Sequence, residues 1–393
     1  MDTIILKIYS PHKFRISNWS LFLPELIKRE YAELSQTERS STRPYLRRFV
    51  LHSKWQDEYL PRVEVFETLT DDRKNIRYIL KIEFSVPKLL YWNSLQEVSE
   101  VDKDRVFLAL KSSLAKVSIS LETETIANAR VSGVHFCKNV LLPKNIRMRE
   151  ILAELGRVDI NKSVDVSSTK HKNGGRVLNI YSGTIDRSFY DKISDSLRPK
   201  NKRTDKGRID HERAVVERYK LQNREVFRYE YRIKKMQTIK REINSILKRE
   251  PQTLVVFNDL FTPNIIKNMI LKSWLELIER PENQLSLFTP TNKLGLFLHI
   301  LSEAKKKNEK AHSMNNALIS YGLITAIRDH GAKEVKGAIF EVWNSDHSER
   351  LTRKIELSAD LTRELPYSNN IAFINKALEK FELISLTSLE KGI

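Results

Sequence analysis

The chain has 393 residues, and its 68 lysines and arginines against 50 aspartates and glutamates give a net charge of +18 and an isoelectric point near 9.7. Such a basic chain is typical of proteins that bind a polyphosphate, with an acidic membrane surface as the competing explanation. A hydrophobic content of 40% argues against global disorder, and the length predicts two or three domains.

The sequence also argues against several classes of protein. No apolar run approaches the ~20 residues that span a bilayer, and Lys7 interrupts the apolar residues 3–9, which predict a strand and not a signal peptide. The single cysteine, Cys137, excludes an internal disulfide and a multi-cysteine zinc site. With 11 glycines and no glycine-rich phosphate loop, the chain does not resemble a dinucleotide enzyme or a P-loop ATPase. We expect a cytoplasmic protein, and we find no convincing amphipathic helix for membrane binding.

Periodicity and turn signals predict an α+β chain. The predicted strands are residues 3–9, 62–67, 78–86, 131–139, 176–181, 188–192 and 226–234. The predicted helices of the same region are residues 19–34, 102–119, 145–156, 211–222 and 236–247. The expected fold is an antiparallel-sheet domain with flanking helices, followed by a smaller helical C-terminal domain.

Domain boundaries are predicted near residues 250 and 283. Residues 1–250 would hold the sheet, residues 251–283 a helical connector, and residues 284–393 the helical C-terminal domain. Short helices around Gly331 permit a helix-turn-helix that recognises duplex DNA. A plain helical packing module is the simpler interpretation.

The strand at residues 226–234 alternates strictly between two kinds of side chain. One face is aromatic and apolar and the other is charged, namely Phe227, Tyr229, Tyr231 and Ile233 opposite Arg228, Glu230, Arg232 and Lys234. A polyanion lying along the charged face would account for three cations beside one carboxylate. Charged residues are equally common on the solvated face of an antiparallel strand.

Tyr190 is the candidate nucleophile. A free tyrosine has a pKa of about 10 and is a poor nucleophile, so it needs a nearby cation or metal. In the strand predicted at residues 188–192, Tyr190 shares a face with Lys192, which would supply that cation. Tyr181 is the rival nucleophile, but it lacks a downstream lysine and acid. A tyrosine beside a lysine is also common as a half-buried strand residue.

Basic residues surround these two segments. A polybasic run is usually a solvated loop, and beside a nucleophile it also commonly clamps nucleic acid. The predicted DNA contacts are Lys88, Arg198, Lys200, Lys202, Arg203, Arg228, Arg232 and Lys234.

Three blocks together resemble the replication-initiation proteins of filamentous phages and rolling-circle plasmids, the gene II and gene X type. The first, Lys81-Ile82-Glu83-Phe84-Ser85-Val86-Pro87-Lys88-Leu89-Leu90, is similar to that family's Ile-Glu-x-Ser-x-Pro-Lys-Leu-Leu block. The second is Phe189-Tyr190-Asp191-Lys192 with Asp195 following. The third, Phe227-Arg228-Tyr229-Glu230-Tyr231-Arg232-Ile233-Lys234, is similar to an Arg-aromatic-Glu-x-Arg-Ile-Lys strand. The three blocks span roughly residues 62–235.

The resemblance implies a nickase that starts rolling-circle replication on single-stranded and origin DNA in a bacterial host. Tyr190 would attack a phosphodiester and form a phosphotyrosine link, which frees a 3′-hydroxyl for a polymerase, and Lys192 would stabilise the phenolate. A host helicase and polymerase would be its partners. The alternative is a non-catalytic, sequence-specific DNA-binding protein of a phage or plasmid.

The resemblance also implies a divalent metal, Mg or Mn. Its ligands would be Glu83, His135 and Glu230, and Asp195 could substitute for one of them. His135 stands where the family has an acidic residue, and a histidine suits Mn better than Mg. No two histidines lie two residues apart, so the His-hydrophobic-His pair of many rolling-circle nickases is absent.

Overall fold

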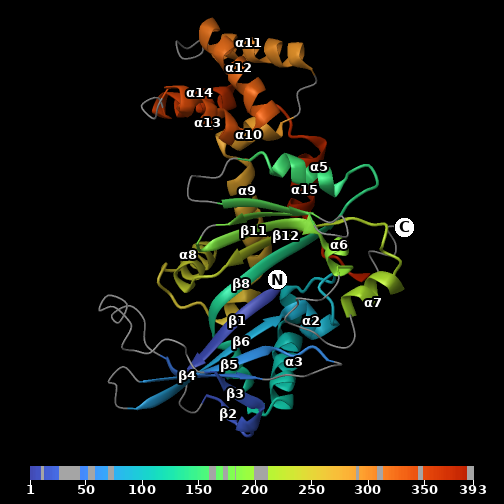
Figure 1. Ribbon diagram of the computed structural model, residues 1–393, viewed down its shortest axis with the longest axis vertical. Coiled ribbons are helices and arrows are strands. Elements are labelled where there is room, and N and C mark those ends of the chain that lie inside the picture. The colour runs from blue at the N-terminus through green and yellow to red at the C-terminus, as the bar shows by residue number, and fades with distance from the viewer. Residues whose placement is uncertain are drawn as a thin grey trace.

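A computed structural model describes residues 1–9, 13–25, 45–51, 58–69, 75–158, 165–170, 176–181, 183–198, 211–288, 292–307, 313–343 and 348–386. Its centre is a ten-stranded antiparallel sheet (Figure 1). In their order across the sheet the strands are β3 (Phe22–Glu25), β4 (Tyr45–Leu51), β5 (Arg62–Leu69), β6 (Ile76–Ser85), β1 (Thr3–Tyr9), β8 (Arg130–Leu141), β12 (Val226–Ile233), β11 (Ile185–Asp191), β10 (Arg176–Tyr181) and β9 (Asp165–Lys170). Two short strands, β2 (Arg15–Ile16) and β7 (Ile119–Ser120), pair separately. The predicted α+β class with an antiparallel sheet is confirmed.

The sheet has one apolar and one polar face, because side chains alternate along each strand. On β1, Ile4, Leu6 and Ile8 are buried in the core, and the cross-strand register aligns them with Phe84, Ile82 and Leu80 of β6. The opposite face carries the odd-numbered residues of β1 and β6 and the even-numbered residues of β11 and β12. We call this the polar face, and the candidate site lies on it.

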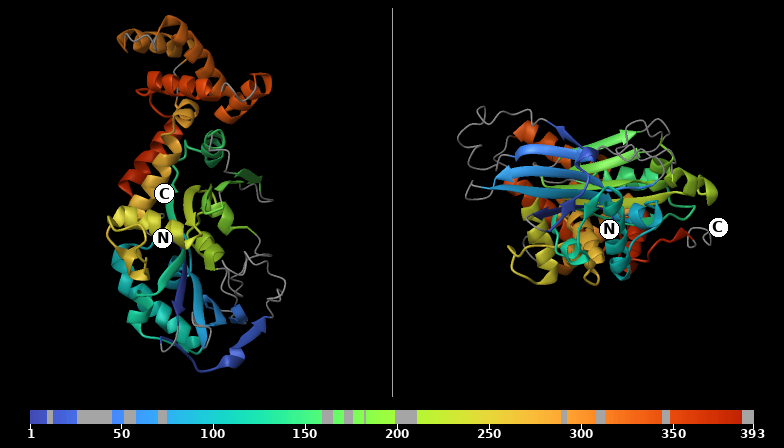
Figure 2. Two further views of the ribbon diagram at one scale, coloured as in Figure 1. Left: turned by 90° about the vertical axis from the view of Figure 1, so that its left-hand side faces the viewer. Right: turned by 90° about the horizontal axis from the view of Figure 1, so that it is seen from below.

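Helices cover the apolar face (Figure 2, left). Those that pack there are α3 (Lys103–Lys116), α5 (Met148–Leu155), α8 (Met236–Leu247), α9 (Ile265–Ile278) and α15 (Asn369–Lys380). Apolar side chains one helical turn apart, such as Ile239 and Ile243 of α8, enter the core and explain why these segments form helices on the sheet. Trp274 of α9 is fully buried against Phe189 and Tyr229 of the central strands.

The remaining helices of the first 280 residues lie around the sheet. They are α2 (Val86–Tyr91), α4 (Thr123–Ala127), α6 (Lys192–Ser196) and α7 (His211–Arg218), with short 3₁₀ turns at Trp19–Leu21, Glu100–Asp102 and Phe257–Phe261. Because Ile193 of α6, Val216 of α7 and Leu95 share a separate apolar cluster, α6 and α7 form one layer at the end of β11 and β12.

A group of helices far along the chain packs around its own apolar cluster at one end of the molecule (Figure 1). These helices are α10 (Pro281–Leu287), α11 (Lys293–Lys307), α12 (Met314–His330), α13 (Ala332–Trp343) and α14 (Ser348–Thr362). A single residue, Gly331 with φ 91°, joins α12 to α13. The glycine that was predicted to mark a turn therefore does so.

The organisation differs from the boundaries predicted at residues 250 and 283. Residues of α9, within the predicted connector, form part of the sheet's main core, and so do Ile371, Ile374 and Leu378 of α15. Pro281, also within the predicted connector, begins α10, which packs with the C-terminal helices. The chain thus leaves the sheet after α9 and returns to it with α15.

Two local predictions are wrong. Residues 19–25 do not form the predicted α-helix: a 3₁₀ turn is followed by β3, whose Phe22 and Leu23 pair with Leu51 and Val50. Residues 26–34 of the predicted helix lie outside the described residues. Lys192 does not continue the strand of Tyr190, because Asp191 accepts backbone N–H bonds from Ile193 and Ser194 and caps α6. Among the described residues, no helix has the length and apolar character to cross a membrane.

Candidate active site

Tyr190 and Glu230 meet on the polar face. Tyr190 lies on β11 directly opposite Arg228 of β12, and Glu230 is one strand step further along β12. The tyrosine hydroxyl donates a 2.5 Å hydrogen bond to Oε1 of Glu230. Both side chains are buried, with Tyr190 9% and Glu230 3% exposed. The predicted nucleophile and one predicted acid therefore form a direct contact between neighbouring strands.

Two arginines on the same strand hold the carboxylate. Arg228 Nε donates to Oε1 of Glu230 at 2.7 Å, and Arg232 Nε donates to Oε2 at 2.8 Å. Burial alone would raise the pKa of Glu230, but the two guanidinium groups overcome it and hold that pKa well below its usual range. Burial and the charge of Glu230 raise the pKa of Tyr190 well above 10, so the proton rests on the phenol.

Arg228 is a buried centre of this network and not an exposed phosphate contact. It is 1% exposed, and besides Glu230 it reaches Asp2 Oδ2 at 2.7 Å, the carbonyl of Ser94 at 2.8 Å and Asn139 Oδ1 at 3.2 Å. The prediction that Arg228 contacts DNA is thus wrong for this arrangement, because the guanidinium group is already surrounded by acceptors. It positions Glu230.

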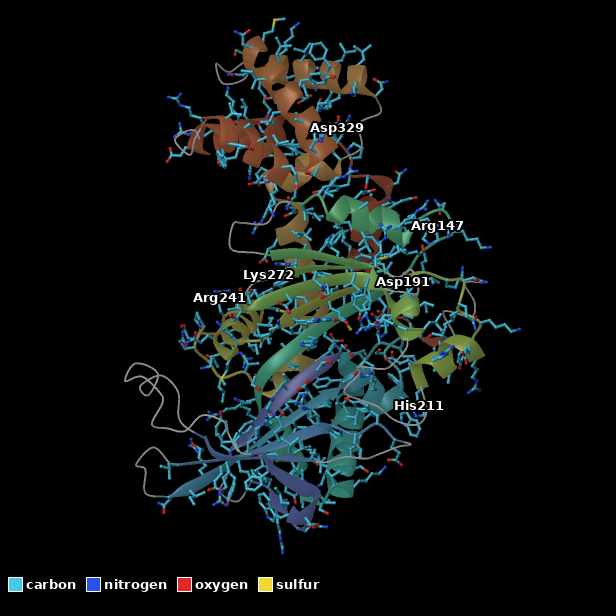
Figure 3. The ribbon with its side chains drawn as sticks, viewed as in Figure 1. Arg147, Asp191, His211, Arg241, Lys272 and Asp329 are labelled. Carbon is cyan, nitrogen blue, oxygen red and sulfur yellow. The ribbon has the colours of Figure 1, made fainter. Side chains whose placement is uncertain are left out.

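Lys192 lies in a second ionic cluster beside the first. Its ammonium is 3.3 Å from Glu212 of α7 and 3.6 Å from Asp195 of α6, and Lys88 approaches Glu212 at 3.6 Å. Glu212 also accepts a 2.5 Å hydrogen bond from Ser94. Figure 3 labels Asp191 at the end of β11 and His211 at the start of α7, the neighbours in sequence of Lys192 and Glu212. Lys192 therefore bonds carboxylates on α6 and α7.

The four predicted metal ligands do not form one cluster. Glu83 lies on β6, and β1 and β8 separate it from β12, which carries Glu230, a lateral distance of three strand spacings or roughly 14 Å. Both oxygens of Glu230 are bonded to arginine, and Asp195 is paired with Lys192 and with Arg198 at 3.5 Å. Within the described part of the chain, no three His, Cys, Asp or Glu side chains are grouped so as to hold a metal ion. The predicted ligand set does not fit an ion in this arrangement.

His135 is the ligand prediction that lies closest to Glu230. It sits on β8 opposite Arg232, and burial together with the charge of Arg232 lowers the pKa of its imidazole. A neutral imidazole could ligate a metal, but the carboxylates whose charges act on it, Glu230, Asp2 and Asp186, are each paired with a cation.

The other predicted DNA contacts vary in exposure. The side chain of Arg232 is 31% exposed and that of Lys234 53%, with Lys234 paired to Asp186. The side chain of Lys88 is 18% exposed and that of Arg198 36%, each paired with an acid. Lys200, Lys202 and Arg203 lie outside the described residues. Tyr229 and Tyr231 are buried on the apolar face, where bases cannot stack on them.

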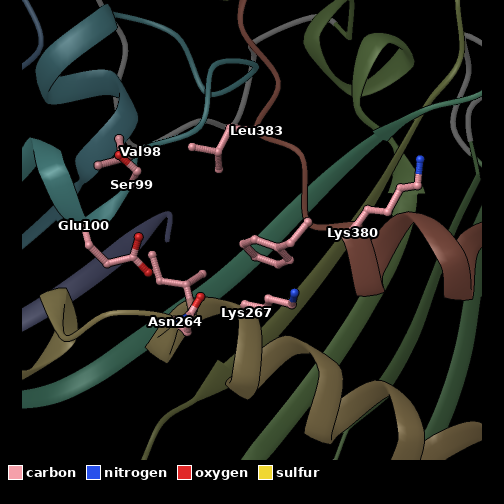
Figure 4. A pocket seen from close by; sticks show the side chains of 9 residues that line it. Val98, Ser99, Glu100, Asn264, Lys267, Lys380 and Leu383 are labelled. Carbon is pink, nitrogen blue, oxygen red and sulfur yellow. The ribbon is translucent and has the colours of Figure 1, made fainter.

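A small cavity of about 200 Å³ lies elsewhere, where the start of α9 faces the end of α15 (Figure 4). Its charged lining side chains are Glu100, Lys267 and Lys380. None of the predicted site residues lines it, so it belongs to the helical side of the molecule and is separate from the site at Tyr190.

Sequence reasoning missed the partners that fix the site. Arg228 contacts Asp2 and Ser94, and Lys192 contacts Glu212, across up to 226 positions of sequence. No local sequence pattern predicts such contacts. Comparisons with models of protein families, with curated proteins and with solved structures gave no match to this chain.

Proposed function

We propose that the protein is a rolling-circle replication initiator that nicks and rejoins single-stranded origin DNA with Tyr190 as its nucleophile. The observation that carries the proposal is the hydrogen bond from the Tyr190 hydroxyl to Glu230, held between two arginines on the polar face of the sheet. A phenol, a proton acceptor and a cation for phosphate are the three groups that phosphoryl transfer to tyrosine needs. The three sequence blocks that resemble the phage and plasmid initiators support the same activity.

The reaction conserves the number of phosphoester bonds. The Tyr190 oxygen attacks the phosphorus, the P–O3′ bond breaks, and the 5′ phosphate becomes linked to the phenol. The phenolic proton passes to Glu230, and the departing 3′ oxygen takes a proton from water to become the hydroxyl that a polymerase extends. Glu230 then returns its proton to water, so no net proton is gained or lost. Because the link is itself a phosphodiester, attack by a 3′-hydroxyl reverses the step and rejoins the strand.

Arg232 couples phosphate binding to proton transfer. A carboxylate with a strongly lowered pKa is a weak base, and the two arginines are the cause of that lowering. The Arg232 side chain is 31% exposed and Arg228 is not accessible, so the incoming phosphate engages Arg232. Because Arg232 then shares its charge with the phosphate, it stabilises the Glu230 carboxylate less, and the pKa of Glu230 rises. Glu230 becomes a stronger base and can accept the proton of the phenol.

The phenol is largely buried, which sets a condition on the reaction. A phosphate reaches Tyr190 only after a local opening of the site. We expect the opening to involve the segments packed around Arg228 and Lys192, which are residues 94–97, α6 and α7. We therefore expect strand binding to precede chemistry as a separate, slower step.

A requirement for Mg or Mn remains a prediction from the resemblance. The predicted ligands are dispersed, so no step above passes through a metal ion. Nicking assays with added Mg, added Mn or excess EDTA test the requirement directly.

The cellular setting is also part of the proposal. Action at a phage or plasmid origin requires the cytoplasm of a bacterial host and a separate helicase and polymerase.

We further propose that α10–α14 form a distinct C-terminal domain, since they share one apolar cluster. Replacing residues 284–365 by a flexible linker should then leave the sheet folded, whereas ending the chain at residue 283 also removes α15 and should destabilise it.

The experiment that tests the activity is nicking of supercoiled plasmid and of single-stranded origin DNA by the wild type and by Tyr190→Phe. The proposal requires loss of nicking in the variant while DNA affinity is retained. Tyr181→Phe is the matched control, because Tyr181 lies on the neighbouring strand β10 and was the rival nucleophile. If the wild type binds DNA but does not nick it with or without metal, the alternative of a non-catalytic DNA-binding protein replaces the proposal.

A further inference from the structure

Most of the chain's positive charge lies outside the C-terminal helices. Residues 281–393 contain 15 lysines and arginines and 14 aspartates and glutamates, so nearly all of the net charge of +18 belongs to residues 1–280. A helix-turn-helix that binds duplex DNA would be expected to carry a basic helix. The surface that attracts a polyanion should therefore be sought on the sheet.

The charges around Tyr190 balance one another. The three cations that β12 and its end contribute, Arg228, Arg232 and Lys234, are each within ion-pair distance of a carboxylate. Those carboxylates are Asp2, Glu230 and Asp186, which gives three negative charges to three positive ones. This half of the polar face positions reacting groups but offers little net attraction for a phosphate backbone.

The other half of the polar face has an excess of cations. We call it the cationic half-sheet, and its basic residues are Arg48 on β4, Arg62 on β5, Arg77 and Lys81 on β6, Lys7 on β1 and Arg130 on β8. The carboxylates on the same face of the described parts of β4, β5, β6 and β1 are Glu64 and Glu83.

Glu64 is shared by three of these cations. Arg48 lies 2.7 Å, Arg62 3.1 Å and Lys81 3.0 Å from its oxygens, while Glu64 itself is 2% exposed. Burial would raise the pKa of Glu64, but the hydrogen bonds from Arg48 and Lys81 lower it below its usual value. Three cations therefore converge on one buried carboxylate.

Lys7 and Lys81 form a repulsive pair across neighbouring strands. They are directly opposite in the register of β1 and β6, and Arg130 is directly opposite Lys7 on the other side. Like charges placed directly opposite on a sheet are destabilising. Burial and the charge of Lys81 lower the pKa of Lys7, which is the expected sign of this repulsion. A phosphate bound over the row would relieve it.

Arg77 and Arg130 flank an aromatic ring on the same face. Their guanidinium carbons lie 5.6 Å and 4.5 Å from the ring centroid of Tyr9. Among the described residues, Nε of Arg77 is buried without a hydrogen-bond partner. A row of cations with an aromatic side chain among them is typical of surfaces that bind single-stranded nucleic acid.

We propose that the cationic half-sheet binds the phosphodiester backbone of single-stranded DNA and supplies most of the affinity for the strand that Tyr190 cuts. The choice of single-stranded DNA as the ligand rests on the proposed function. β1 and β11 are three strand spacings apart, roughly 14 Å, so one strand crossing the polar face can contact both halves.

The test measures binding without chemistry, by fluorescence anisotropy of a labelled oligothymidylate of about 20 nucleotides in EDTA across a salt series. The main variant is Lys7→Gln, Arg77→Gln, Arg130→Gln, which leaves all three partners of Glu64 in place. Because each lost phosphate contact lowers the slope of log affinity against log salt by about 0.7, the slope should fall by about 2. Affinity near 100 mM salt should fall by on the order of tenfold.

Two further variants make the outcome specific. Lys240→Gln, Lys267→Gln, Lys376→Gln removes three cations from α8, α9 and α15 on the helix-covered side, and it should keep the wild-type slope. Glu64→Gln removes the shared carboxylate and should tighten binding by about threefold, a gain that damage to the fold would not produce. Thermal melts of each variant check folding.

The proposal is overturned if the main variant binds like the control variant, or if Glu64→Gln weakens binding. It is also overturned if the wild type binds phosphatidylserine vesicles and not the oligonucleotide. Failure of the nickase proposal is distinguishable, because it would show as absent nicking while the salt slope still depends on the cationic half-sheet.

Discussion

The Tyr190 hydroxyl and the Glu230 carboxylate are joined by a 2.5 Å hydrogen bond between adjacent strands, and Arg228 and Arg232 hold the same carboxylate. One buried acid thus connects the phenol's proton to two cations. The arrangement keeps the phenol protonated at rest, because burial and the neighbouring negative charge both raise its pKa. It also makes the electrostatics of the site testable apart from any activity.

Arg228 should be the most sensitive position of the network to substitution. Arg228→Gln leaves Glu230 and Asp2 without their shared cation, and removing one partner of a buried ion pair costs about 3–5 kcal/mol. Urea unfolding gives the free energy. Lys234→Gln is the control, since its side chain is 53% exposed and its pair with Asp186 should be worth less than about 1 kcal/mol. Equal costs for the two variants would contradict the network.

Stability should fall on acidification in a way that Glu230 controls. The pKa of Glu230 is lowered well below 4.5 in the folded protein, so below pH 4.5 the unfolded chain binds a proton that the folded chain does not. Stability from this group is fully present above pH 4.5 and is lost as the pH falls toward the folded pKa, by up to about 1.4 kcal/mol per pH unit.

The measurement is the free energy of unfolding from pH 6 to pH 3. Glu230→Gln should show a shallower acid loss than the wild type, whereas Glu356→Gln, at an exposed position of α14, should follow the wild-type curve. An unchanged pH profile in Glu230→Gln would mean that the arginines do not hold the carboxylate as described.

α9 should behave as part of the sheet domain. Trp274 is fully buried between α9 and the strands that carry Tyr190 and Glu230, so Trp274→Ala should cost about 3–5 kcal/mol and reduce any nicking with it. Trp92→Ala, at a side chain that is 45% exposed, is the matched control and should cost far less. A small effect at Trp274 would favour the predicted connector instead.

The sequence predicted the strands well where alternation is strict. The segment from Phe227 to Ile233 places aromatic and charged side chains on opposite faces, as expected, and Tyr190 lies on the face of Glu230. The strand prediction was wrong where a single local contact ends the strand, because Asp191 caps α6 and Lys192 is therefore helical. The sequence also could not show which residues of the charged face are buried. The carbonyl of Ser94, 134 positions before Arg228, accepts a hydrogen bond from that arginine, and residue type alone does not reveal such a contact.

The cationic half-sheet was not foreseen for a related reason. Lys7, Lys81 and Arg130 come from three strands that are distant in the sequence, and only the register of β6, β1 and β8 aligns them in one row. Sequence patterns reveal only basic residues that cluster along the chain, such as those after Tyr190.

The most direct test of the central claim is to identify the residue that becomes covalently attached to DNA. After incubation with single-stranded origin DNA and nuclease trimming, tryptic digestion should release the peptide Ser-Phe-Tyr-Asp-Lys, residues 188–192, in which Tyr190 is the one tyrosine. The account predicts a nucleotide adduct on this peptide in the wild type and none in Tyr190→Phe. An adduct on another tyrosine such as Tyr181, or nicked DNA with no protein attached, would contradict it.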